Sequence, residues 1–246
     1  MMNNQHSVKD VYEKKYVYNG LDNGVLVAPQ ISGSKALDLL GLKKQGDIYP
    51  EFVDKEVTDV WWWLSNLAFE LYASAKKITI VDPIFASENL NDFLEQEKER
   101  AGNRLQQTQQ FTARHIAHIL LAQKEIYTGI ERRQHYDTSA DQKISRNPSF
   151  AQDIQWVDPN SQDVIFFNFV LDKLHKGDNT LVIEEMRKAL QSAFNITKSW
   201  WKIMGVHDVS SNSDEIITAL DNLLLPWYYV EYDQKDRYLV FCLYKE

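Results

Sequence analysis

The sequence predicts an α/β protein built on a mostly parallel sheet of seven strands with helices on both faces. Short β-branched runs alternate with helical segments over most of the 246 residues, which is the pattern of consecutive βαβ units. Two β-rich runs separated by a polar turn then close the chain, which indicates an antiparallel hairpin. The composition, 44% hydrophobic and 25% charged, is typical of a globular domain.

The first βαβ unit follows a polar lead-in, residues 1–50, which we expect to form a cap over the main domain. Residues 56–60 indicate a strand, residues 64–74 have the apolar spacing of a helix, and residues 77–82 form a second β-branched run. Because βαβ crossovers join parallel strands, the carboxyl ends of these two strands should lie at one edge of the sheet.

The rest of the chain supplies an insertion and the remaining strands. Residues 87–134 are strongly helical and residues 135–152 indicate a loop, so a helical insertion is expected over about 87–150 of a main domain spanning 51–246. Further strands are expected at 153–157, 163–168 and 202–206, helices at 181–194 and 213–224, and the closing hairpin at 228–232 and 238–244.

Charge and hydropathy exclude several classes of partner. A net charge of -8 disfavours nucleic acid, because binding to phosphates needs clustered Lys and Arg. No apolar stretch is long enough to span a membrane and no secretory signal is evident, so a cytoplasmic location is expected. His115 and His118 share a helix face but lack a third ligand, so no metal site is predicted. A small molecule or another protein is the expected partner.

Acids stand at the ends of the first two strands. The segment Val57–Ala68, with Asp59 in the strand, resembles the first motif of class I S-adenosylmethionine-dependent methyltransferases, in which a strand ends in an acid and a glycine-rich turn follows. Val81-Asp82-Pro83 resembles the second motif of that family. The resemblance implies a Rossmann-like fold, S-adenosyl-L-methionine as cofactor, and methyl transfer to a small molecule or a protein.

The resemblance also implies roles for individual residues. Asp59 would orient the methionine part of the cofactor, Asp82 would accept hydrogen bonds from the ribose hydroxyls, and Asp158 would lie at the adenine edge. Asn168, at the end of the fourth strand, would face the substrate crevice. The other expected cofactor contacts are Trp61, Trp62, Trp63, Ser65 and Pro83. No catalytic base is identifiable; His207 could supply acid-base chemistry or could simply end a strand.

Tryptophans occupy the positions where this family needs glycines. Trp61, Trp62 and Trp63 stand in the cofactor turn, and the pair Trp200-Trp201 precedes the fifth strand, where Lys-Pro-Gly-Gly is common. Glycine is needed in the cofactor turn because the backbone must adopt unusual φ values and let the cofactor approach. A chain with genuine tryptophans in this turn should bind S-adenosylmethionine poorly and be inactive.

Three explanations of the seven tryptophans remain open at this stage. Their codons could be UGA, which some bacterial lineages read as glycine and which another code reads as tryptophan. They could be ordinary core residues. They could form a protein-binding hot spot on a catalytically inactive, methyltransferase-like scaffold. A nicotinamide oxidoreductase is a more distant alternative, since it would need a glycine-rich turn directly after the strand without the acid.

Overall fold

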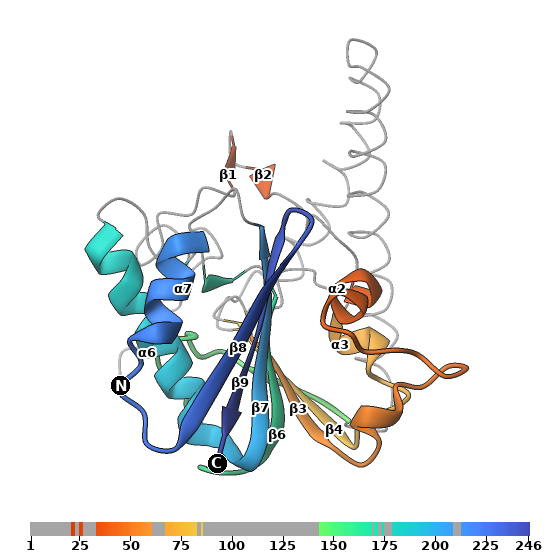
Figure 1. Cartoon of the computed structure of the whole chain (residues 1–246). Coiled ribbons are helices and arrows are strands. Elements are labelled where there is room, and N and C mark those ends of the chain that lie inside the picture. Colours follow the sequence, from red (N-terminus) through yellow and green to blue (C-terminus); the bar gives the residue numbers. More distant parts are fainter. Residues whose placement is uncertain are drawn as a thin grey trace.

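The computed structural model describes residues 21–22, 25–26, 33–60, 67–82, 85, 143–168, 170–171, 174, 179–208 and 213–246. Its central feature is a seven-stranded sheet in the order β5-β4-β3-β6-β7-β9-β8 (Figure 1). The strands are β3 (Glu56–Val60), β4 (Lys77–Val81), β5 (Ile144–Asn147), β6 (Gln162–Asn168), β7 (Thr197–Asp208), β8 (Tyr228–Lys235) and β9 (Tyr238–Lys245). A separate antiparallel pair joins β1 (Leu21–Asp22) to β2 (Val25–Leu26).

Five strands of the sheet are parallel and two are antiparallel. β5, β4, β3, β6 and β7 run in the same direction, whereas β9 pairs antiparallel with β7 and β8 pairs antiparallel with β9. Numbered by their order along the chain within this sheet, the strands lie as 3-2-1-4-5-7-6. The predicted fold class, including the closing hairpin, is therefore confirmed.

Helices cover both faces of the sheet. α6 (Asn179–Ile196) and α7 (Ser213–Asp221) lie on one face, and α2 (Gly33–Leu39) and α3 (Leu67–Glu70) lie on the other (Figure 1). The central strand β6 is buried at every position, as expected of a parallel strand covered on both sides. The 3-10 turn η1 (Pro50–Phe52) adds Phe52, whose ring lies 5.7 Å from that of Phe166 in β6. None of the helices in the described ranges is long and apolar enough to cross a membrane.

Two sequence predictions near the edge of the sheet are wrong. Residues 144–147, expected in a loop, form the edge strand β5, whose Ile-Ser-Arg-Asn sequence has too few apolar residues to indicate a strand. Residues 153–157, expected to form a strand, make only an isolated bridge between Phe150 and Asp153. Trp156 has φ 57°, outside the range of regular β-strands, and it lies in a bend after this bridge.

Gly205 in β7 allows a close aromatic contact. Any Cβ at this position would overlap the ring of Phe241 in β9, which lies directly over the glycine. The same Phe241 ring stacks on His207, with centroids 6.0 Å apart and planes inclined by 4°. The glycine is thus required for steric reasons at the junction of the parallel and antiparallel parts of the sheet.

Gly205→Ala is expected to lower the free energy of unfolding by about 1–3 kcal/mol, because overpacking forces side chains off their rotamers. Urea unfolding of the variant beside the parent chain measures this loss. Phe241→Leu provides the control: in the double variant the alanine should cost less, since the smaller side chain leaves space for Cβ. An unchanged midpoint in Gly205→Ala would contradict the packing argument.

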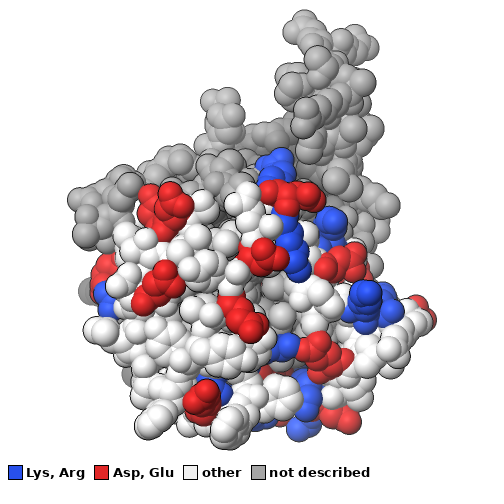
Figure 2. Space-filling model, in the orientation of Figure 1, with Lys and Arg blue, Asp and Glu red and all other residues white. Residues whose placement is uncertain are grey.

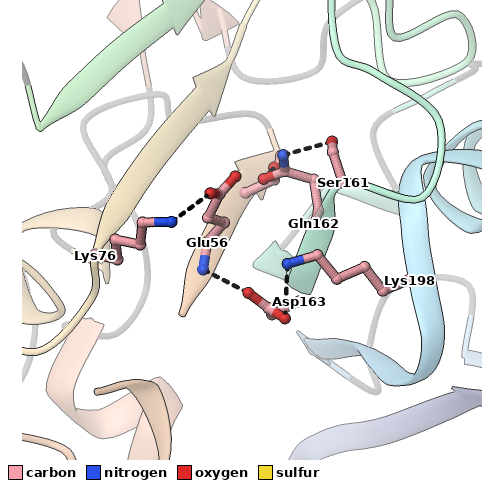
Figure 3. Close-up of polar contacts among 7 residues, drawn as sticks. Glu56, Lys76, Ser161, Gln162, Asp163 and Lys198 are labelled. Atoms are coloured by element: carbon pink, nitrogen blue, oxygen red, sulfur yellow. Dashed lines mark hydrogen bonds and ion pairs between the residues drawn. The ribbon is translucent and has the colours of Figure 1, made fainter. Parts of the chain in front are cut away.

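A network of polar side chains joins the amino ends of β3, β6 and β7 (Figure 3). The carboxylate of Asp163 accepts hydrogen bonds from the amide of Glu56 at 2.8 Å and from Nζ of Lys198 at 3.0 Å. The hydroxyl of Thr58 donates to Oε1 of Gln162 at 2.8 Å. Asp163 is only 5% exposed, so its charge is compensated by these partners rather than by water. We infer a structural role for this end of the sheet.

Asp163→Asn should therefore destabilise the protein by about 1–3 kcal/mol, because the half-buried Lys198 ammonium loses its countercharge. Chemical denaturation measures the change. The site described below lies at the opposite end of β6, so ligand binding there should be unaffected. Equal stability of variant and parent would show that the ion pair contributes nothing.

Candidate functional site

Strand register brings three polar side chains to one edge and one face of the sheet. Asp59 in β3 lies opposite Ile80 of β4 and Phe166 of β6. Asp82 and Asn168 each follow these partners by two residues, and side chains two residues apart point to the same face of a sheet. The chain remains extended at Asp82, whose amide donates to the carbonyl of Asn147 at 3.0 Å. Asp59, Asp82 and Asn168 therefore gather at the carboxyl ends of three neighbouring strands.

These three side chains are buried although they are polar. Asp59 and Asp82 are 0% exposed, and Asn168 is 7% exposed. Neither carboxylate oxygen of Asp59 reaches a hydrogen-bond partner of good geometry among the described residues. Burying an ionised carboxylate costs on the order of several kcal/mol unless a partner compensates the charge. A ligand that brings a cation or hydrogen-bond donors to this edge would provide that compensation.

The environment of Asp59 raises its pKa well above the usual value of 3.8. Burial is the largest cause, because it disfavours the charged form. The backbone amide of Ala68 in α3 acts in the opposite direction, and the negative charge of Asp82 raises the pKa further. The mutual effect of the two acids agrees with their placement at neighbouring strand ends, which is the arrangement predicted from the sequence.

Part of the predicted site lies outside the described residues. This applies to Trp61, Trp62 and Trp63, and also to Ser65 and Pro83. The same holds for most of the predicted cap and helical insertion, including His115 and His118. The roles expected for these positions therefore remain predictions from the sequence.

Asp158 is exposed, in the segment that leads into the amino end of β6. It lines a pocket of about 260 Å³ that extends from Glu56 and Lys77, the first residues of β3 and β4, to Asn147 and Pro148 at the end of β5. The structure thus does not place Asp158 at the end of a strand beside Asp82, and its expected role at the adenine edge stays a prediction from the sequence.

The sequence reasoning missed Asn147, the last residue of β5. Its carbonyl accepts the amide hydrogen of Asp82, and its side chain is 5% exposed. It thus ends the strand next to β4, where the adenine edge of a cofactor bound at Asp82 would be expected. The step from Asn147 to Pro148 is the signal that the sequence offers, because proline ends a strand, but the polar residues around it favour a loop.

His207 does not belong to this group of side chains. Val206 lies opposite Asn168 in the register of β6 and β7, so His207 points to the other face of the sheet. It is fully buried there and stacks on Phe241. In the described part of the chain, no cluster of three or more His, Cys, Asp or Glu side chains could hold a metal ion. The edge offers hydrogen-bond acceptors and negative charge, which suit a ligand with hydroxyl groups and a cation.

Comparisons with known proteins agree with the strand order. No family model matches the chain, and no curated protein matches it. A provisionally assigned S-adenosyl-L-methionine-dependent methyltransferase from Methanococcus maripaludis superimposes with a TM-score of 0.51 at 13% identity, covering 100% of this chain and 97% of that one.

Two further structures have lower scores. A SAM-dependent methyltransferase from Aquifex aeolicus has a TM-score of 0.49 and 12% identity, covering 97% of this chain and 98% of that one. A provisionally assigned rRNA methylase from Clostridium thermocellum has a TM-score of 0.46 and 12% identity, covering 80% of this chain and 90% of that one. Sheet order, the antiparallel closing strands and the first of these likenesses show that the chain has the class I methyltransferase fold.

Proposed function

We propose that the protein, with glycine at positions 61–63, binds S-adenosyl-L-methionine at the carboxyl edge of β3, β4 and β6 and transfers its methyl group to an acceptor. The observation that carries the proposal is the fully buried Asp59 carboxylate, which lies beside the negative charge of Asp82. Apart from the approach of the Ala68 amide, its oxygens make no hydrogen bond of normal geometry to the described residues. When bound, the cofactor supplies an activated methyl group on a sulfonium. The protein then has mainly to position the two reactants and exclude water.

Each residue of the edge has a distinct task in this proposal. Asp82, at the end of β4, accepts hydrogen bonds from the two ribose hydroxyls, for which an acceptor-only carboxylate is suited. Asp59 faces the positively charged methionine end, where a cation compensates its buried charge. Asn168 ends β6 at the same edge and orients the acceptor through its amide. An amide cannot remove a proton at neutral pH, so Asn168 is assigned no role as a base.

A small molecule or a protein is the proposed acceptor. The net charge is -8, and on the face drawn in Figure 2 Lys and Arg side chains are interspersed with Asp and Glu. A nucleic-acid acceptor would call for clustered basic residues that release counterions from the phosphates. The charge pattern therefore favours an acceptor that is not a polyanion.

A catalytically inactive scaffold with the same fold is the second candidate. The tryptophans at 61–63 favour it, because indoles in the cofactor turn would occupy space that the methionine and ribose need. Such a scaffold would act as a protein-interaction module. The two candidates differ in one measurable property, which is the affinity for the cofactor.

Calorimetric titration with S-adenosylmethionine tests the proposal. The chain carrying Trp61→Gly, Trp62→Gly and Trp63→Gly should bind with a dissociation constant of about 1–100 μM, in the range of common enzyme substrates. The chain with tryptophan at these positions serves as the matched comparison and should show no heat of binding. Absence of binding in both chains would refute the proposal and leave the scaffold.

A further inference from the structure

Three tryptophans have a backbone conformation that tryptophan rarely adopts. Trp156, Trp200 and Trp227 have φ values of 57°, 67° and 52°, in the left-handed region. A bulky residue with positive φ is a genuine outlier, because its Cβ crowds the neighbouring carbonyl oxygen. Glycine has no Cβ and adopts this conformation without strain.

The other residues with positive φ show how unusual this is. In the described ranges, the remaining non-glycine examples are Asp54, Asn160 and Asp236, whose side chains tolerate the left-handed region. Gly41 and Gly46 adopt it with φ values of 81° and 61°. Tryptophan is thus the one residue type in this set that has no local reason to be there.

The three indole rings are mostly exposed, so their burial does not compensate for the backbone strain. The exposed fractions are 76% for Trp156, 81% for Trp200 and 78% for Trp227, whereas tryptophan is highly buried on average. Each residue lies where the backbone bends. Trp156 and Trp227 are in bends, and Trp200 is at the place where the register between β6 and β7 shifts. These are places where glycine commonly permits a turn or a bulge.

Trp201 shows the contrast within the same chain. It lies in β7 opposite Lys245, is half-buried, and packs against the hydrophobic core. Nζ of Lys55 lies 4.1 Å from the centroid of its ring, a cation-π contact. Its side chain therefore has an environment that suits an indole, and its backbone is not among those with positive φ.

We infer that the natural polypeptide has glycine at 156, 200 and 227, because its codons there are UGA and are read as glycine. The composition agrees: the chain has nine glycines and seven tryptophans, of which six remain candidates when Trp201 is set aside. At an average glycine usage of about 7%, roughly 17 glycines would be expected, nearer to the two groups together than to the nine glycines alone. The three positions carry the inference without reference to the cofactor.

We apply the same inference, glycine in place of tryptophan, to the cofactor turn at 61–63, and this step rests on the proposed function. Glycine at 61, 62 and 63 would turn the segment after Asp59 and Val60 into the glycine-rich turn that close approach of S-adenosylmethionine requires. The apparent conflict between a methyltransferase fold and a tryptophan-filled turn would then disappear. The inactive scaffold would lose the observation that favours it.

Sequencing the gene decides the inference directly. UGA codons at positions 156, 200 and 227 are expected and would support it, whereas UGG at any of the three would overturn it. The result is independent of cofactor binding, because a codon is read without the cofactor, and Trp200 and Trp227 adjoin the Lys245 end of β9, away from Asp59 and Asp82. A negative result here therefore leaves the proposed function to its own titration.

Thermal unfolding provides a second test on the protein itself. Trp156→Gly, Trp200→Gly and Trp227→Gly should each raise the Tm by about 2–4 °C, because glycine relieves the left-handed strain and little burial is lost. Trp201→Gly is the matched control and should lower the Tm, since it removes a packed ring. A lower Tm in the first three variants would show that tryptophan belongs at these positions and would overturn the inference.

Discussion

Asp59→Asn is expected to stabilise the protein near neutral pH by about 1–3 kcal/mol, because the amide carries no charge whose hydration is lost on burial. Folding raises the pKa of Asp59 above its unfolded value of 3.8, so the contribution of Asp59 to stability is complete below pH 3.8. This contribution is lost as the pH rises through the raised pKa, because the folded state must then hold a buried carboxylate. The asparagine variant avoids this loss, so its advantage should shrink as the pH falls towards 4.

The same substitution should weaken cofactor binding although it stabilises the empty protein. The proposed cation at the methionine end interacts with the charged carboxylate and not with an amide. Urea unfolding from pH 4 to pH 8, combined with calorimetric titration, measures both effects on the chain with glycine at 61–63. A variant that is destabilised at neutral pH, or that binds S-adenosylmethionine as tightly as its parent, would contradict the role given to Asp59.

Asp82→Ala is expected to reduce the affinity for S-adenosylmethionine by about 100-fold or more. Two charge-assisted hydrogen bonds to the ribose hydroxyls would be lost, each worth about 1.5–3 kcal/mol. Calorimetric titration of the chain with glycine at 61–63 gives the ratio of dissociation constants. The loss should be specific to ligands with a ribose, so methionine alone should bind equally well to variant and parent.

Two other acids provide comparisons for this prediction. Asp163→Asn alters a carboxylate near the amino ends of the strands and should not change the dissociation constant. A loss of affinity in Asp158→Asn would support the sequence prediction that places Asp158 at the adenine edge. A loss in Asp163→Asn as large as that in Asp82→Ala would contradict the placement of the cofactor at the carboxyl edge.

Much of the fold could be predicted because its strands carry strong local signals. β3 was predicted with the bounds that the structure shows, and β4 and β6 differ from their predictions by one residue. These strands are buried and rich in β-branched or aromatic residues, which contrast with the turns around them. The positions of Asp59 and Asp82 could also be predicted, because both acids lie at or near the ends of strands and the strands of a βαβ unit are parallel.

The edge of the sheet could not be predicted in the same way. β5 pairs on one side only and is partly exposed, so its sequence lacks the apolar run that revealed the central strands. The expected strand at 153–157 rested on β-favouring residues, among them Trp156. Its positive φ breaks an extended chain, and no propensity scale for tryptophan signals such a conformation.

The central claim is that Asp59 and Asp82 hold an adenosine-bearing sulfonium at the carboxyl edge of the sheet. A crystal structure of the chain with glycine at 61–63, grown with S-adenosylhomocysteine, tests it most directly. We predict both ribose hydroxyls about 2.5–2.7 Å from the carboxylate oxygens of Asp82, with the amino group of the ligand on the side of Asp59. Density for the ligand anywhere else, for example beside Glu56 and Asp163, would contradict the account.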